Sequence, residues 1–165
     1  MKIFYNNFAQ VKDKYGLFRL FKKPTILQDA FWGPLLFVAS KDASKNHYEG
    51  KGYFSPAKSL IEYIIKAGTE GPTDKQKQFY LDLQADFPAY THKIKPLIEN
   101  EFRNWKENFF IKDFNKEFKI VHITIPRLNH GPASWDMVFE TVHDANHQVI
   151  IDFIEDQPRS VLIDG

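Results

Sequence analysis

The sequence contains no cysteine among its 165 residues. Disulfide bonds, catalysis by a thiolate and zinc sites with cysteine ligands are therefore excluded. Short catalytic motifs are missing as well. There is no GxSxG turn for a nucleophilic serine, no GxGxxG loop for a dinucleotide and no phosphate-binding P-loop. The enzyme classes that such motifs identify are not indicated here.

Long apolar runs are also absent. No window approaches the roughly 18 apolar residues that a membrane-spanning helix requires. The first twenty residues are interrupted by polar side chains such as Lys2, Asn6, Gln10 and Asp13, so they do not form the apolar segment of a signal peptide. We therefore expect a cytoplasmic protein without a membrane partner.

Neither sign of charge is in excess, since 22 basic and 21 acidic residues give a net charge of +1. Nucleic-acid-binding proteins usually carry a strong basic excess, often as a stripe. Lys22 and Lys23 are the only adjacent basic residues in this chain. Rings at Tyr48, Tyr53 and Phe54 could stack on bases, but without a basic stripe we expect no nucleic-acid partner.

Aromatic residues are abundant, with 16 Phe, 7 Tyr and 3 Trp. Phe is mostly a core residue, so we expect a core built largely from rings. Alternatively, some Tyr and Trp rings line a binding face, because both residues suit places where an apolar body meets a polar edge. The length is that of one domain, and no repeat or linker interrupts it. We predict a single domain over residues 1–165.

Short apolar and β-branched stretches predict strands in the first half of the chain. Turns are expected at 32–34, at the polar run 40–46 and at 55–58. The first twelve residues fit either a short helix or a frayed arm. The strands are predicted at 17–21, 26–31, 35–39, 47–54 and 60–66, the last of which a short helix could also explain.

The strongest local signal starts a helix after the glycine-containing break at 68–71. Thr73 and Gln76 have capping-box spacing, in which the threonine hydroxyl accepts from the Gln76 N–H and the Gln76 side chain reaches back. Apolar residues then follow at four-residue steps on one helical face. They are Phe79, Leu83 and Phe87.

A second helical segment follows. Pro88 either starts it at its first position or kinks the first helix. Pro96 is expected to break the segment, so that its regular part covers 97–108. We predict that the apolar faces of both helices pack against the sheet. The side chains expected to be buried there are Phe79, Leu83, Phe102 and Trp105.

The C-terminal third alternates apolar and polar residues and predicts strands at 117–126, 135–142, 148–154 and 160–163. Alternating strands joined by short turns are antiparallel, with one buried face. No alternation of strand and helix runs through the whole chain, so a doubly wound fold is not expected. The predicted fold is α+β: an antiparallel sheet with a C-terminal β-meander, packed against two or three central helices.

The stretch from His143 to His147 is the most tempting candidate for chemistry. Two histidines at the ends of a hairpin turn could share a metal ion, but the spacing matches no known zinc pattern. Asp144 and Asn146 already account for a turn. We expect two exposed turn histidines, no metal site and no cofactor. A third metal ligand would have to come from His122, His130 or Asp136.

Paired carboxylates and a nucleophilic serine are not indicated either. Asp136 and Glu140 lie on the same, solvent-facing side of a predicted strand. Four residues span about 13 Å along a strand, which is too far for a glycosidase-type pair. Ser134 precedes a strand and not a helix, so it does not occupy a nucleophile turn.

Two features could serve a protein partner. Tyr48, Tyr53 and Tyr90 stand beside charged or polar residues and are candidate surface rings, although they could simply cap the edge of the core. The connector from Arg127 to Pro132, which includes His130, is the other candidate, because binding residues concentrate in loops on a rigid scaffold. It could equally be an ordinary strand connector.

Two stretches resemble small uncharacterised bacterial domains that occur beside toxin–immunity genes. They are Glu70 to Tyr80, which opens the central helix, and His143 to Gly165, a final hairpin ending in Ile-Asp-Gly. The resemblance implies an α+β domain without known enzymatic activity, of an immunity-type binding protein, and transfers no catalytic residue. The near-neutral charge departs from the acidic character expected of an inhibitor that covers a basic nuclease.

Two functions are therefore in competition. The first is a non-enzymatic domain that binds another protein. The second is a small enzyme or ligand-binding domain that uses His143, His147 and nearby carboxylates. Convergence of those side chains in a concave pocket would favour the second, whereas an exposed apolar or aromatic patch on a flat face would favour the first.

Overall fold

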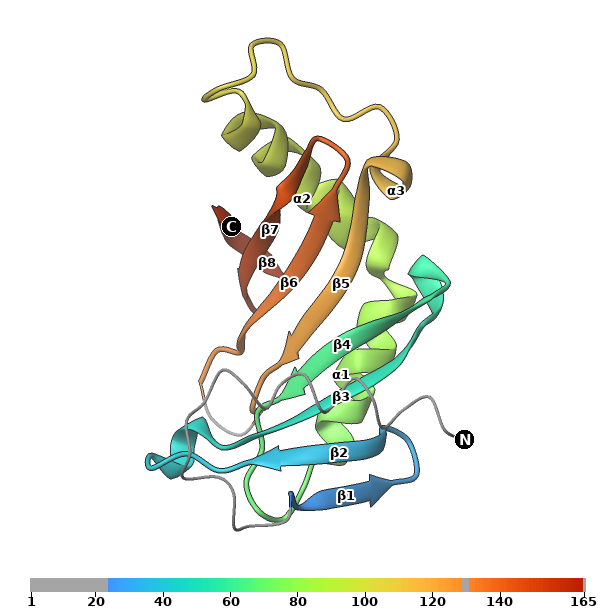
Figure 1. Cartoon of the computed structure of the whole chain (residues 1–165), viewed down its shortest axis with the longest axis vertical. Coiled ribbons are helices and arrows are strands. Elements are labelled where there is room, and N and C mark those ends of the chain that lie inside the picture. The colour runs from blue at the N-terminus through green and yellow to red at the C-terminus, as the bar shows by residue number, and fades with distance from the viewer. Residues whose placement is uncertain (1–23, 129–130, 165) are drawn as a thin grey trace.

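Residues 24–128 and 131–164 are described by the structure, a computed structural model. They form an eight-stranded sheet whose strands lie in chain order, with helices behind it (Figure 1). The strand predicted at 17–21 and the first twelve residues lie outside the described part. The strands are β1 (Ile26–Asp29), β2 (Gly33–Val38), β3 (His47–Phe54), β4 (Ser59–Ile65), β5 (Phe118–Ile125), β6 (Ser134–Thr141), β7 (Asp144–Ile154) and β8 (Gln157–Asp164).

The helices fall mainly between β4 and β5. They are α1 (Asp74–Ala85), α2 (Phe87–Phe102) and the single turn α3 (Phe114–Glu117), and the short 3₁₀ turns η3 (Ala43–Lys45) and η4 (Ser55–Ala57) lie between the early strands. An α+β fold is therefore confirmed. None of the described helices is both long and apolar enough to cross a membrane.

The predicted antiparallel sheet is wrong at one pair of strands. β4 and β5 run parallel, with Glu62 opposite His122. The helices α1, α2 and α3 connect these two strands, and so long a connection returns the chain to the same end of the sheet before β5 begins. The other neighbouring strands in the described sheet pair antiparallel.

Glycines in β3 make room for a tyrosine ring of the neighbouring strand. Gly50 pairs with Tyr63, and a Cβ atom at Gly50 would lie 2.6 Å from that ring. Gly52 leaves similar space. The Tyr63 ring can therefore lie against the β3 backbone, because neither position has a side chain in the way. The Tyr63 hydroxyl donates to the carbonyl of Trp32. Burial raises the pKa of Tyr63 to about 12, which keeps the hydroxyl protonated as a donor.

The capping box of α1 is confirmed, and its glutamine does more than cap the helix. Gln76 N–H donates to the Thr73 hydroxyl, and Thr73 N–H donates to Gln76 Oε1 at 3.0 Å. The Gln76 side chain amide also donates to the carbonyls of Lys66 at 3.0 Å and Pro126 at 2.8 Å. These carbonyls directly follow β4 and β5, so Gln76 ties the start of α1 to the ends of the two parallel strands.

Helix α2 begins with Pro88 near its first position but differs from the prediction at its other end. Pro96 lies inside the helix and does not break it. It sits on the exposed side, where water can satisfy the carbonyl that loses its N–H donor, and the neighbouring Ile94 and Ile98 are fully buried. The helix ends at Phe102 instead of continuing to 108. The burial predicted for Trp105 is therefore wrong, because this residue lies beyond the end of the helix and its side chain is 50% exposed.

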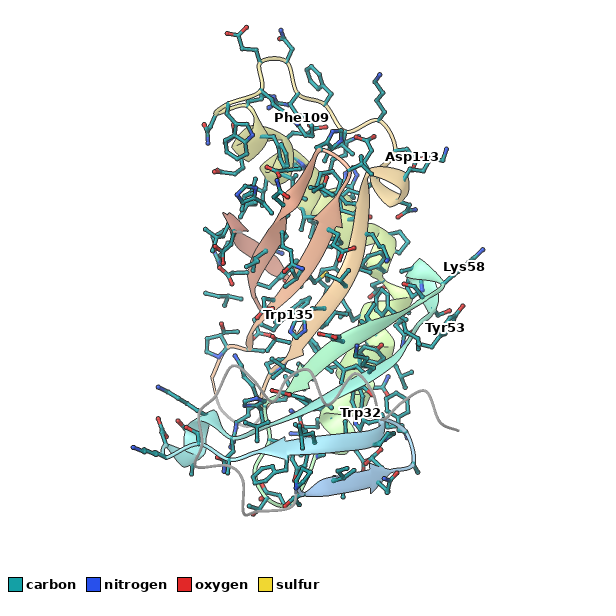
Figure 2. All side chains as sticks on the ribbon, viewed as in Figure 1. Trp32, Tyr53, Lys58, Phe109, Asp113 and Trp135 are labelled. Carbon is teal, nitrogen blue, oxygen red and sulfur yellow. The ribbon has the colours of Figure 1, made fainter. Side chains whose placement is uncertain are left out.

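Aromatic rings fill much of the space between sheet and helices, as predicted. Trp32 and Tyr80 pack near one end of the molecule, with ring centroids 5.1 Å apart. Trp135 stacks on Phe153 in the middle, and Phe109 lies at the other end (Figure 2). Of the other predicted core residues, Leu83 and Phe102 are buried and Phe79 is partly buried.

Candidate functional site

The three tyrosines predicted as surface rings have different surroundings. Tyr48 is only 3% exposed and its hydroxyl donates to the Thr69 carbonyl, so the prediction of a surface ring is wrong there. Tyr90 is partly buried, with its ring edge-on to Trp135. Tyr53 is 59% exposed and remains available to a partner.

The connector after β5 has a structural role at its first residue. Arg127 donates through one guanidinium nitrogen to the carbonyls of Ala43 at 3.2 Å and Asn46 at 3.4 Å. It therefore links the end of β5 to the loop between β2 and β3. His130, the other predicted residue of this connector, lies outside the described residues.

The two histidines of the β6–β7 hairpin have separate partners. His143 Nε2 lies 2.7 Å from Glu117 Oε2, and the His143 carbonyl accepts from Lys106 at 2.7 Å. Glu117 also accepts from the backbone N–H groups of Lys112 and Asp113. Burial raises the pKa of Glu117, but these hydrogen bonds outweigh it and hold that pKa below its ordinary value. His143 is therefore partly buried, so the prediction of an exposed turn histidine is wrong there, and its contacts fix the segment between α2 and β5.

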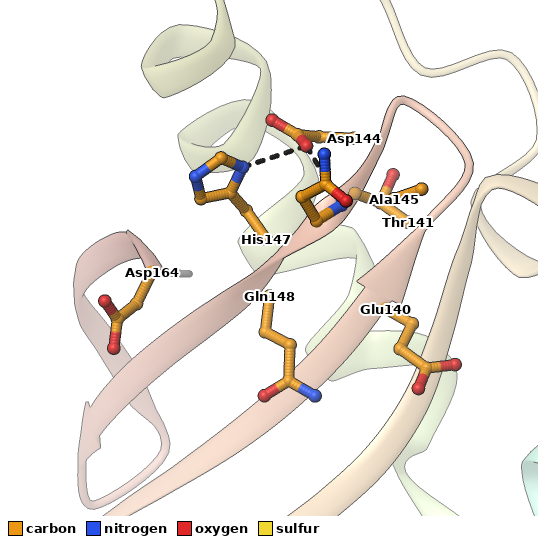
Figure 3. Close-up of a pocket in the computed structure, with 8 residues that line it drawn as sticks. Glu140, Thr141, Asp144, Ala145, His147, Gln148 and Asp164 are labelled. Atoms are coloured by element: carbon orange, nitrogen blue, oxygen red, sulfur yellow. Dashed lines mark hydrogen bonds and ion pairs between the residues drawn. The ribbon is translucent and has the colours of Figure 1, made fainter.

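His147 lines a shallow hollow beside the hairpin (Figure 3), and His143 is not among the residues that line it. Its Nδ1 is 2.9 Å from Asp144 Oδ1, an ion-pair distance without the alignment of a hydrogen bond. The adjacent His147 ring holds the pKa of Asp144 below its ordinary value. Glu140, Gln148 and Asp164 complete the polar lining. The described residues contain no group of three histidine or carboxylate side chains that could hold a metal ion.

The sheet surface that faces away from α1 and α2, which we call the open face, carries a marked charge bias. Its members follow from the strand registers, since directly paired residues point to the same side of a sheet. Paired positions on this face hold six carboxylates but only two lysines, and the rest of the chain carries the compensating basic excess. The carboxylates are Glu49, Glu62, Asp136, Glu140, Asp152 and Asp164, and the lysines are Lys51 and Lys119.

Two of these carboxylates lie directly opposite each other at the centre of the acidic area. Asp136 of β6 pairs with Asp152 of β7, a placement that brings Cβ atoms to about 5 Å. Asp152 accepts from the Ser160 hydroxyl at 2.5 Å, but no lysine or arginine forms a salt bridge with either aspartate among the described residues. Like charges in this position destabilise a sheet, so the fold alone does not account for them.

Apolar side chains alternate with the carboxylates on the open face. Ile150 pairs with Leu162, which is 53% exposed, and with Val138 on its other side. At the far side of the face, the exposed Tyr53 pairs with the exposed Leu60. Val138 is buried, so the exposed apolar groups of this face are Leu162, Tyr53 and Leu60. Tyrosine is among the residue types enriched at protein interfaces.

His122 lies on the open face between a carboxylate and an apolar residue. It pairs with Glu62 on one side and Val138 on the other, and its Nε2 is 3.3 Å from the Thr124 hydroxyl. Burial lowers the pKa of His122, while Asp136 and Glu62 act in the opposite direction. The lowered pKa favours a neutral ring near pH 7, so His122 adds little positive charge to the acidic face.

Comparison of this chain with protein families, with curated proteins and with solved structures finds no match. The sequence did place Asp136 and Glu140 on a solvent-facing side, but the alignment of carboxylates from five strands depends on strand order. That order includes a parallel pair between strands that are more than fifty residues apart in the sequence.

Proposed function

We propose that this chain is a non-enzymatic protein-interaction domain whose open face binds a partner protein with a basic surface. The observation that carries the proposal is the opposition of Asp136 and Asp152 on an acidic face. Such a pair costs stability in the isolated fold but gains a counterion when lysine or arginine of a partner covers it. Natural proteins commonly give up stability at the residues that serve function.

The charge distribution also supports an immunity-type role within this proposal. A net charge of +1 argues against an acidic inhibitor only if charge is spread evenly. Here the carboxylates concentrate on one face, and electrostatic complementarity acts through local potential, which steers association and excludes partners of the wrong sign. A basic toxin surface is the kind of partner that this face would suit.

A photoreactive amino acid at Leu162 tests the location of the binding surface in cells of the source organism. Leu162 is exposed on the open face, whereas Leu81 is exposed on α1 and provides the matched control. We expect the Leu162 position to crosslink to one predominant protein through a basic segment, and the Leu81 position not to do so. The double substitution Asp136→Lys and Asp152→Lys should remove that product. Equal crosslinking from both positions, or a product insensitive to charge reversal, would contradict the proposal.

A further inference from the structure

The first 23 residues have the charge opposite to that of the open face. They contain six basic residues and a single acidic one, Asp13. The basic residues are Lys2, Lys12, Lys14, Arg19, Lys22 and Lys23, and six aromatic residues, Phe4, Tyr5, Phe8, Tyr15, Phe18 and Phe21, are interspersed with them. Lysine, arginine and aromatic side chains together are the residue types expected of a partner for an acidic surface with exposed apolar groups.

This segment joins the described chain at the edge of the open face. The Thr25 carbonyl accepts from Phe37 N–H at 2.9 Å, which holds the start of β1 on the sheet. The next residue, Ile26, is exposed and pairs with Leu36. From Leu36 the same row of paired residues continues across the sheet through Glu49, Ile64, Thr124 and Asp136 to Asp152.

The distance along this row is within reach of the segment. Neighbouring strands lie about 4.8 Å apart, so the five steps from Ile26 to Asp136 cover roughly 24 Å. A chain of 23 residues can extend to about 75 Å. Even a folded or looped segment could therefore bring its basic residues over the Asp136–Asp152 pair.

We propose that residues 1–23 bind the open face of their own chain, with Lys12 and Lys14 beside the Asp136–Asp152 pair. Attachment at β1 gives the segment a high effective concentration at this face, which a free partner lacks. The inference uses the same face as the proposed function, and it adds that a partner must displace this segment. Binding would then be weaker for the full chain than for one whose segment has lost its charge.

Zero-length carbodiimide crosslinking of the full chain tests the proposal, because this reagent joins a lysine amine to a carboxylate only when they are in contact. We expect peptides that join Lys12 or Lys14 to Asp136 or Asp152. Exposed carboxylates at the two ends of α1 serve as controls and should give no such product. These controls are Asp74 and Asp86.

A mixture of ¹⁴N- and ¹⁵N-labelled chains separates the possible occupants of the face. Products within one label support binding in cis, whereas products that combine the two labels show that a second copy supplies the segment and overturn the proposal. Equal yields at Asp74 and Asp86, or no product at all, also overturn it. Raising salt to about 1 M should suppress the expected products, because the screening length falls to about 3 Å.

Hydroxyl-radical oxidation provides a second readout that does not depend on crosslinking. In the full chain carrying Lys12→Glu and Lys14→Glu, oxidation of Leu162 should increase several-fold, and oxidation of Leu81 should not change. An unchanged Leu162 signal would refute the proposal. If crosslinks in cis are absent while an external partner still crosslinks at Leu162, only the role of residues 1–23 fails and the proposed function stands.

Discussion

Replacement of Gln76 by alanine should destabilise the protein more than any other single change at a polar residue of α1. The side chain is 2% exposed and donates to the carbonyls of Lys66 and Pro126. Its loss leaves both carbonyls without this donor, at a buried position for Pro126 and a partly buried one for Lys66. Each buried group that loses its partner costs about 1–3 kcal/mol, so Gln76→Ala should lower the free energy of unfolding by about 2–6 kcal/mol.

Urea denaturation at 25 °C measures this loss, with Gln78→Ala as the matched control. Gln78 is exposed on the same helix and bonds to Asp82 within it, so its removal should cost no more than about 0.5 kcal/mol. Thr73→Ala, which removes the other half of the capping box, should cost about 1 kcal/mol. If Gln76→Ala lies within experimental error of Gln78→Ala, the link between α1 and the two parallel strands does not stabilise the fold.

The variant Gln76→Glu sharpens the test, because it keeps the side-chain shape and the acceptor for Thr73 N–H. At neutral pH the introduced carboxylate cannot donate to the two carbonyls and repels them. Its pKa should rise in the folded state, so the destabilisation appears as pH increases through the ordinary glutamate pKa of about 4.3. A loss that does not change between acidic and neutral pH would show that hydrogen-bond donation is not the relevant property.

Three further predictions concern other parts of the structure. Asp136→Asn should raise the free energy of unfolding by about 0.2–1 kcal/mol in urea denaturation, because it removes a like-charge cross-strand pair; a decrease would indicate that the pair is not repulsive. Phe102→Ala should lower that free energy by about 3–5 kcal/mol. Trp105 is half exposed, so Trp105→Ala should lower it much less. Equal losses would place Trp105 in the core. The lowered pKa of Glu117 implies that this carboxylate stabilises the fold fully above its ordinary pKa and that the stabilisation is lost as pH falls below it. Glu117→Gln should therefore flatten the decline of the urea midpoint between about pH 7 and pH 3. An unchanged slope would refute this.

Local patterns predicted local structure well. The capping box at Thr73 and the alternation of Trp135, Met137 and Phe139 depend on neighbours in the sequence, and the structure confirms both. The face of Tyr48 could not be predicted in this way. The next two positions of β3 that face inward are glycines, Gly50 and Gly52. The strand therefore lacks the alternation of apolar and polar residues that would show Tyr48 to face inward.

Features set by distant contacts were not predictable from local spacing. Phe109 continues the apolar spacing of α2, yet the helix ends at Phe102 and the chain turns back through a left-handed Asn108. This lets the Phe109 ring stack on Phe102 with centroids 4.5 Å apart, so tertiary packing replaces the last helical turns. The open face could not be predicted for the same reason, since its carboxylates become neighbours only through the order of the strands in the folded sheet.

The dissociation constant of the partner that crosslinks at Leu162 tests the central claim most directly. It should be measured with the wild-type chain, with Asp136→Lys and Asp152→Lys together, and with Asp74→Lys and Asp86→Lys together, at several salt concentrations. The account predicts that reversal of charge on the open face weakens binding and reduces its salt dependence, whereas the same change in charge at the two ends of α1 leaves both close to wild type. Equal weakening by the two double variants, or wild-type affinity after reversal at Asp136 and Asp152, would contradict it.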